Sequence, residues 1–210
     1  MPADLGRAVA HYRHLASRYD RATWLVNEVR RRAVAALELS AGETVLDAGC
    51  GTGFCFSPIL ERIGPRGRLI AFDPCPELLA VARERVATVG WTNVTLSQAD
   101  AASFDASGAR PGALLFSYVH DVLQCEAALD NLLGQAAPAA RVALCGSVLW
   151  PHWAWPVNWY LRATHRRYIT NMENFDRPWA RIASRLQAFR VERQGPGWRY
   201  LATGRLPGRA

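Results

Sequence analysis

Between residues 43 and 150 the sequence alternates short, almost continuous apolar runs with longer segments of helical periodicity. The apolar runs are the predicted strands, and they are residues 43–48, 68–73, 93–100, 112–119 and 140–150. Strands that are apolar on both faces and separated by helices are typical of a parallel sheet covered by helices on both sides. This alternation therefore predicts an α/β fold and excludes all-helical and sandwich architectures.

The ends of the chain depart from this alternation. Residues 8–37 show two helical runs, 178–187 a further helix, and 187–204 a hairpin that turns at the Gly-Pro-Gly of 195–197. No internal repeat and no linker-like stretch interrupts the 210 residues, so a single domain is predicted. Its expected parts are an N-terminal helical cap (1–40), a core (41–149), an aromatic and basic segment (150–186), and a hairpin with a tail (187–210).

The loop after the first strand belongs to the stretch VLDAGCGTGFC, residues 45–55. Closely spaced glycines let a ligand lie against the backbone. A dinucleotide site needs a small residue where Phe54 stands, and a P-loop needs a lysine, which this chain lacks entirely. Asp47 before the glycines disfavours a phosphate and favours a ligand that carries an ammonium group.

These residues resemble the first motif of the class I S-adenosylmethionine-dependent methyltransferases. The resemblance implies a Rossmann-like fold with a mostly parallel seven-stranded sheet, helices on both faces and an antiparallel C-terminal hairpin. It also implies S-adenosylmethionine as cofactor, S-adenosylhomocysteine as product, and 41–149 as the cofactor-binding core. The cofactor contacts that it implies are Tyr12, Asp47, Gly49, Cys50, Gly51, Gly53, Asp73, Pro74, Asp100, Ala101, Ser117 and Tyr118.

Two acids have specific roles in this comparison. Asp73, at the end of a predicted strand, would accept hydrogen bonds from both ribose hydroxyls, and Asp100 would bind the adenine amino group. Each acid also has a structural alternative: Asp73 as a helix cap, and Asp100 as a turn residue.

Three residues are candidates for catalysis: His120, Asp121 and Tyr19. His120 titrates near neutral pH and could accept a proton from the acceptor; the favoured alternative is a hydrogen bond to the loop backbone. Tyr19 precedes Asp20 in a pair that resembles the quinone- and phospholipid-methylating branches. Tyr12 and Tyr19 could reach the cofactor carboxylate, fence the acceptor pocket, or pack a helix on the sheet.

The segment LWPHWAWPVNWYLRATHRRY, residues 149–168, contains half of the eight tryptophans and no acid. The candidate substrate contacts are Trp150, His152, Trp153, Trp155, Trp159 and Arg166. Three alternatives are open: a cage for a cationic amine, contact with lipid headgroups, or a wall of the acceptor pocket that also packs the core. Pro151 and Pro156 predict that the segment begins as a shaped loop, in keeping with a lid.

All 25 basic residues are arginine, and their excess lies in the last third of the chain. Residues 1–149 hold 14 Arg against 15 acids, and residues 150–210 hold 11 Arg against 3 acids. The alternatives are an anionic partner or a solvated basic face. The five cysteines form no C-x-x-C pair, so they are expected to be buried thiols, and no metal site is expected.

The N-terminus has no signal-peptide pattern, so a cytoplasmic protein is expected. The expected function is methylation of a small acceptor that is apolar or carries an amine, phenol or thiol. The alternatives are a phosphatidylethanolamine-type N-methyltransferase in peripheral contact with an anionic membrane, a nucleic-acid methyltransferase, or a non-catalytic cofactor-binding subunit. An N-P-P-Y type signature is absent, which makes nucleic acid the less expected partner. The oligomeric state is left open.

Overall fold

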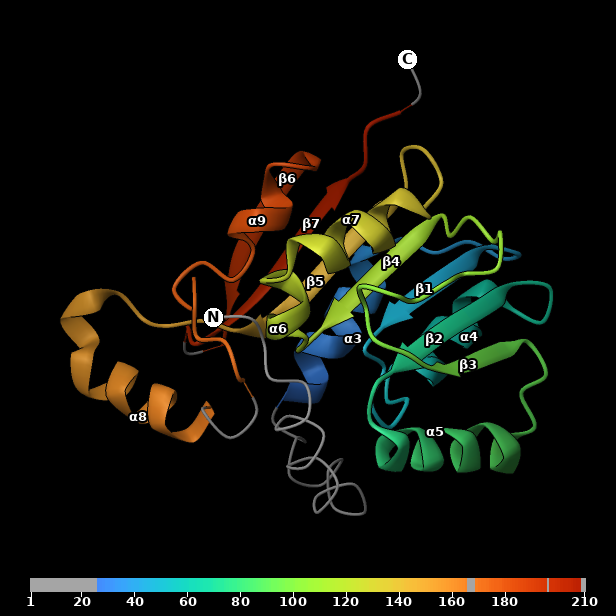
Figure 1. Cartoon of the computed structure of the whole chain (residues 1–210), viewed down its shortest axis with the longest axis horizontal. Coiled ribbons are helices and arrows are strands. Elements are labelled where there is room, and N and C mark those ends of the chain that lie inside the picture. Colours follow the sequence, from blue (N-terminus) through green and yellow to red (C-terminus); the bar gives the residue numbers. More distant parts are fainter. Residues whose placement is uncertain (1–25, 166–168, 196, 209–210) are drawn as a thin grey trace.

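In the computed structural model, residues 26–165, 169–195 and 197–208 are described (Figure 1). Seven strands form one sheet in the order β3-β2-β1-β4-β5-β7-β6. The strands are β1 (Thr44–Ala48), β2 (Arg68–Asp73), β3 (Val94–Gln98), β4 (Ala113–Ser117), β5 (Arg141–Ser147), β6 (Gln187–Gln194) and β7 (Arg199–Arg205). The first five strands pair in parallel, and β7 runs antiparallel to both β5 and β6. The predicted mostly parallel sheet with an antiparallel C-terminal hairpin is confirmed.

Helices cover both faces of this sheet. On one face, α3 (Asn27–Ala36), α4 (Phe56–Ile63) and α5 (Pro76–Val89) share a buried cluster with Val45 and Leu115. On the other face lie α6 (His120–Leu123), α7 (Glu126–Gly134) and α9 (Ala180–Ala183), which pack on a second cluster. Successive strand residues point to opposite faces, so β1 turns Leu46 to the α7 side and Asp47 to the α3 side.

Some element boundaries differ from the sequence expectation. The helix expected near 124–136 is present as α7, and the four-residue α6 ahead of it was not expected. The helix expected over 178–187 is reduced to the four residues of α9. From Gln187 the chain is already a strand, because β6 pairs with β7 along the edge of the sheet. Hydrogen bonds to a partner strand thus override the local helical pattern at this point.

The aromatic segment forms a short 3-10 turn, η3 (His152–Ala154), followed by α8 (Trp155–His165). Pro151 stands in the loop, as expected, but Pro156 lies in the first turn of α8. Proline is tolerated there because first-turn N–H groups have no partner within the helix. In Figure 1, α8 stands away from the sheet. Among the helices of the described ranges, none is both long and apolar enough to cross a membrane.

Candidate functional site

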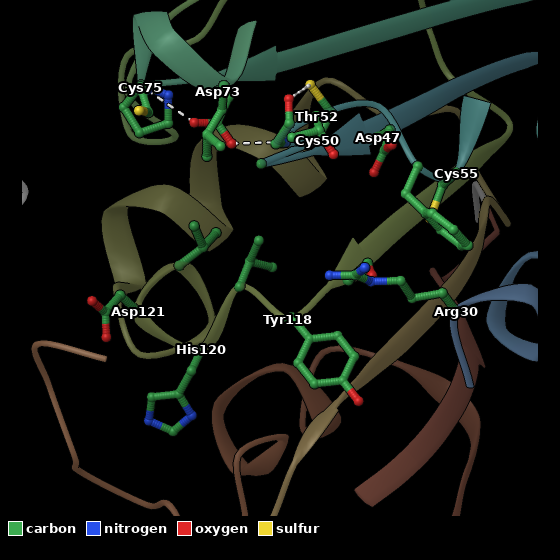
Figure 2. A pocket seen from close by; sticks show the side chains of 18 of the residues that line it. Arg30, Asp47, Cys50, Thr52, Cys55, Asp73, Cys75, Tyr118, His120 and Asp121 are labelled. Carbon is green, nitrogen blue, oxygen red and sulfur yellow. Dashed lines mark hydrogen bonds between the residues drawn. The ribbon is translucent and has the colours of Figure 1, made fainter. Parts of the chain in front are cut away.

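A pocket opens at the carboxyl ends of β1, β2 and β4 (Figure 2). This is where the strand order reverses: β2 and β3 extend from β1 in one direction, and β4 with the later strands in the other. Open parallel sheets bind ligands at such a switch point, because the loops on its two sides leave a crevice. The pocket is lined by the glycine loop, by the ends of these strands, by Arg30 of α3 and by Ile169.

The glycine loop takes a backbone path that other residues would not follow. Gly49 has φ +68°, and a Cβ built on it would lie 2.5 Å from Cγ1 of Val119. The Cys50 N–H donates to the Phe72 carbonyl at 2.9 Å, which ties the loop to β2. At Gly53 a side chain is excluded by a different neighbour, because a Cβ built there would lie 2.5 Å from the Phe56 ring. It does not line the pocket, so it serves helix packing there instead of the expected cofactor contact.

Asp73 ends β2 on the pocket wall and is buried. Its Oδ2 accepts from the Gly51 N–H and its Oδ1 from the Cys75 N–H, both at 2.9 Å. Burial raises the pKa of Asp73 to about 6, and these two N–H donors act in the opposite direction. Asp73 is not the N-cap of α5, which is Cys75, and its two bonds hold the glycine loop and the turn ahead of that helix instead. Each carboxylate oxygen still has capacity for a ligand hydroxyl.

Asp47 is almost completely buried, and neither of its oxygens accepts a hydrogen bond from the described residues. Burial raises the pKa of Asp47 to about 7; the nearby Arg30 lowers it and Asp73 raises it further. A buried carboxylate without hydrogen bonds is costly, so such groups commonly serve a ligand. Asp47 faces the pocket from beneath the glycine loop (Figure 2).

Arg30 was not predicted from the sequence as a site residue. It is only 5% exposed, and its guanidinium carbon lies 5.2 Å from the Tyr118 ring centroid and 5.4 Å from that of Phe54. The sequence does contain a signal for it. Arg30 lies three, four and seven residues before the buried Ala33, Val34 and Leu37, so a cation occupies an apolar helical stripe.

Tyr118 follows β4 directly and has φ +60°, an unfavourable value for a residue with a side chain. Its N–H donates to the Cys145 carbonyl at 2.8 Å, which holds the turn in place. Strained residues of this kind cluster at functional sites. Ser117, Tyr118 and Pro74 all line the pocket, as the resemblance implies.

His120 and Asp121 also line the pocket, but their polar atoms bind the loop at 169–173. His120 Nε2 lies 3.0 Å from the Glu173 carbonyl, so this nitrogen is the donor, and Figure 2 shows the ring turned away from Asp47 and Asp73. Asp121 accepts from the Thr170 N–H, the Thr170 hydroxyl and the Asn171 N–H. This geometry gives both side chains a positioning role, and their part in catalysis stays a prediction.

Several predicted site residues lie elsewhere. Asp100 accepts from the Ala102 N–H at 2.8 Å in a local turn, and Ala101 is buried in the core; neither lines the pocket. Trp153, Trp155 and Trp159 are 70%, 72% and 70% exposed. They neither wall the pocket nor pack the core, which corrects that alternative. Trp150 and His152 line a separate shallow hollow. Tyr12, Tyr19 and Arg166 lie outside the described residues.

The pocket also contains Cys50, Cys55 and Cys75, which are free thiols. Burial is the main cause that raises the pKa of each of these thiols above its usual value. They are therefore poor nucleophiles near neutral pH. Within the described part of the chain, no group of three or more His, Cys, Asp or Glu side chains is arranged to hold a metal ion.

The chain resembles known methyltransferases in sequence and in fold. Residues 45–138 match a family described as a methyltransferase domain. The chain is 39% identical over 67 residues to the protein-L-isoaspartate O-methyltransferase of Ignicoccus hospitalis, covering 32% of each chain. It is 36% identical over 87 residues to the aklanonic acid methyltransferase of a Streptomyces species, covering 41% of this chain and 40% of that one. The alignments thus span less than half the length of these curated relatives.

A solved S-adenosylmethionine-dependent O-methyltransferase from Thermotoga maritima has the same fold, with a TM-score of 0.64 at 12% identity. The superposition covers 87% of this chain and 66% of that one. The family match thus covers the glycine loop and the strands that follow it, and the structural match covers most of the chain.

Proposed function

We propose that this chain, which belongs to the class I methyltransferases by its fold and by the family match over residues 45–138, transfers a methyl group from S-adenosylmethionine to a small-molecule acceptor. The observation that carries the proposal is the buried Asp47 carboxylate, which has no hydrogen-bond partner in the described chain and lies under the glycine loop. A cationic ligand in the pocket would supply the missing partner.

The charges of the pocket fit this cofactor at both ends of its amino-acid part. Asp47 matches an ammonium group, and the guanidinium of Arg30 matches a carboxylate. Asp73 keeps acceptor capacity for the two ribose hydroxyls, as the resemblance implies. Gly49 leaves the backbone bare where a side chain would collide with Val119. The charges and acceptors of these residues therefore support S-adenosylmethionine as the cofactor.

When bound, S-adenosylmethionine supplies a methyl group that its sulfonium has already activated for displacement. The protein then has to hold the acceptor atom in line with that methyl and keep water out. Val119, Val122 and Ile169 give the pocket an apolar side, which supports an apolar acceptor. A base is needed only for an acceptor that arrives protonated, and His120, Asp121 and Tyr19 stay the proposed candidates.

A phospholipid acceptor is the second candidate function. The observation that favours it is the exposed aromatic helix α8, whose indoles are turned to solvent, whereas most large apolar side chains of the described residues are buried. The curated relatives do not choose between acceptors, since one is named for a protein isoaspartate and the other for aklanonic acid.

Calorimetry with S-adenosylmethionine and S-adenosylhomocysteine tests the cofactor. We expect binding by the wild type, and Asp73→Ala should weaken it about ten- to a hundredfold because a buried charge-assisted pair is lost. Asp105→Ala, an exposed acid remote from the pocket, is the matched control and should bind as the wild type does. No binding by the wild type at about 1 mM ligand, a weak affinity by the usual scale, would remove the proposal.

An acceptor screen with cofactor labelled on the methyl group tests the reaction itself. Amines, phenols, thiols and phospholipids are offered separately. Label in a small molecule supports the first candidate, and label only in phospholipid supports the second. Cofactor binding without label transfer to any class would assign the chain to the non-catalytic alternative.

A further inference from the structure

The outer side of η3 and α8 is apolar where a surface helix is normally polar. Trp153, Trp155 and Trp159 are 70%, 72% and 70% exposed, and Tyr160 is 62% exposed. Trp155 and Trp159 are one helical turn apart, so they form a stripe, and Tyr160 adjoins it. We call these four side chains the aromatic face. Val89 and Val157 are the other large hydrophobic side chains that are exposed within the described ranges.

The inner side of α8 shows that this orientation is built into the fold. Leu161 is buried and packs with Leu149 and Phe175. Asn158, also on the inner side, accepts from the Trp150 N–H at 2.8 Å and donates to the Trp150 carbonyl at 3.1 Å. Asn158 thus makes hydrogen bonds on the inner side of the helix, while the indoles face the solvent. An ordinary amphipathic helix would have polar side chains on that outer side.

The charges on the aromatic segment itself have one sign, although Asp176 lines a hollow together with Arg162. Residues 150–165 contain no Asp or Glu, and Arg162 is exposed beside the indoles. Trp and Tyr are the residues that favour the boundary between lipid tails and water, and arginine beside them attracts anionic headgroups. We propose that the aromatic face adsorbs to the headgroup region of an anionic phospholipid bilayer.

Two other occupants fit these observations less well. A second copy of the chain would bring together two helices that carry Arg162 and no acid, and like charges oppose this contact. Single-stranded nucleic acid is usually held in a basic groove with bases stacked along it. This face is instead a helix that stands away from the sheet, and among residues 150–165 only Arg162 is an arginine (Figure 1).

The aromatic face is connected to the pocket. Ile169, four residues beyond the end of α8, lines the pocket, and the next two residues donate to Asp121 on its rim. Adsorption of α8 would therefore hold the pocket near the bilayer surface. The inference goes beyond the proposed methyl transfer and does not depend on it, since it concerns a surface and not the reaction.

Co-sedimentation of the full chain with vesicles tests the inference. The vesicles are phosphatidylcholine alone or phosphatidylcholine with about 30% phosphatidylglycerol, enough to give a marked negative surface potential. We expect binding to the anionic vesicles that weakens as salt is raised, and at least tenfold weaker binding to the neutral ones. No binding to anionic vesicles, or equal binding to both kinds, overturns the proposal.

Variants assign the binding to the aromatic face. Trp155→Ser combined with Trp159→Ser should weaken partition onto anionic vesicles at least tenfold, whereas Val89→Ser, 58% exposed on α5, should leave it unchanged. Arg162→Gln should weaken it severalfold, and Arg66→Gln, an exposed arginine in the turn after α4, should not. Because all five positions are exposed, circular dichroism and thermal unfolding of each variant should match the wild type.

The same variants also test the two alternative occupants, a second copy of the chain and single-stranded nucleic acid. If the double tryptophan variant partitions as the wild type does, the aromatic face is not the contact and the proposal fails. It fails equally if sedimentation equilibrium shows a homodimer that the double variant dissociates, or if the wild type binds single-stranded RNA but not vesicles. In those cases the face belongs to a second copy or to nucleic acid.

Discussion

At the scale of single residues, the pocket is defined by two buried carboxylates and one buried guanidinium. Asp47 and Asp73 stand on adjacent strands. Burial raises the pKa of both carboxyl groups, because their ionised forms are costly away from water. Arg30 offsets part of this cost at Asp47. Keeping these groups charged and buried costs free energy in the ligand-free protein. Groups with pKa values perturbed in this way cluster at functional sites.

Asp47 makes the stability of the ligand-free protein depend on pH. Its pKa is about 7 in the folded protein against a model-compound value of 3.8. Between these values the folded chain holds a proton that the unfolded chain has lost, so the free energy of unfolding falls as pH rises. Asp73, with a pKa of about 6, acts in the same direction.

We therefore expect Asp47→Asn to reduce the fall in unfolding free energy between pH 4 and pH 7 by about 4 kcal/mol, from a shift of about three pKa units. Urea unfolding at several pH values measures this. Asp105→Asn, at an exposed position, should keep the wild-type slope. An Asp47→Asn slope equal to that of the wild type would show that Asp47 is not protonated on folding.

At the scale of elements, the segment after α8 is attached to the sheet through α6. Asp121 of α6 accepts hydrogen bonds from two residues about 50 positions later, and His120 reaches Glu173. On α9 and the residue after its C-cap, Arg181 and Arg185 pair with Glu126 and Asp130 of α7. Part of the basic excess of the last third therefore holds the C-terminal segment against the core.

The attachment through Asp121 is testable by amide hydrogen exchange. Asp121→Ala removes the acceptor of the Thr170 and Asn171 N–H groups, so their exchange should accelerate about ten- to a hundredfold. Asp105→Ala, which removes the acceptor of the Ser107 N–H, should leave residues 170 and 171 unchanged. Unchanged exchange in Asp121→Ala would remove the positioning role and favour Asp121 as a catalytic group.

At the scale of the whole molecule, the seven strands make one sheet, and its C-terminal pair completes the core. β7 lies between β5 and β6, and Tyr200 of β7 is among the largest fully buried side chains. Its ring lies against Gly146 of β5, where a Cβ would be 3.0 Å from Cε1 of Tyr200. The last third is thus part of the same cooperative structure as the pocket.

We expect Tyr200→Ala to lower the free energy of unfolding by about 3–5 kcal/mol, because a large aromatic side chain is removed from the core. Far-UV and near-UV circular dichroism in urea should report the same shifted midpoint. Tyr160→Ala, 62% exposed on α8, is the matched control and should change stability by about 0.5 kcal/mol or less. Two separate transitions in the variant would show that the C-terminal strands unfold independently.

The sheet, the helices on its two faces and the place of the glycine loop were all predictable from the sequence. These features rest on local periodicity and on residue types such as glycine, whose constraints act within a few positions of the chain. The acid at the end of β2 was predictable for the same reason, because the end of a parallel strand points to the edge where ligands bind.

Which side chains meet at the pocket became known from the folded chain alone. Arg30 reaches Tyr118 from a helix far earlier in the chain, Asp121 turns to Thr170, and Asp100 turns back to its own loop. The orientation of such side chains depends on contacts between distant segments, which no local pattern contains. The exposure of Trp155 and Trp159 was undecided for the same reason, because an indole stripe on a helix faces the core or the solvent according to what packs beside it.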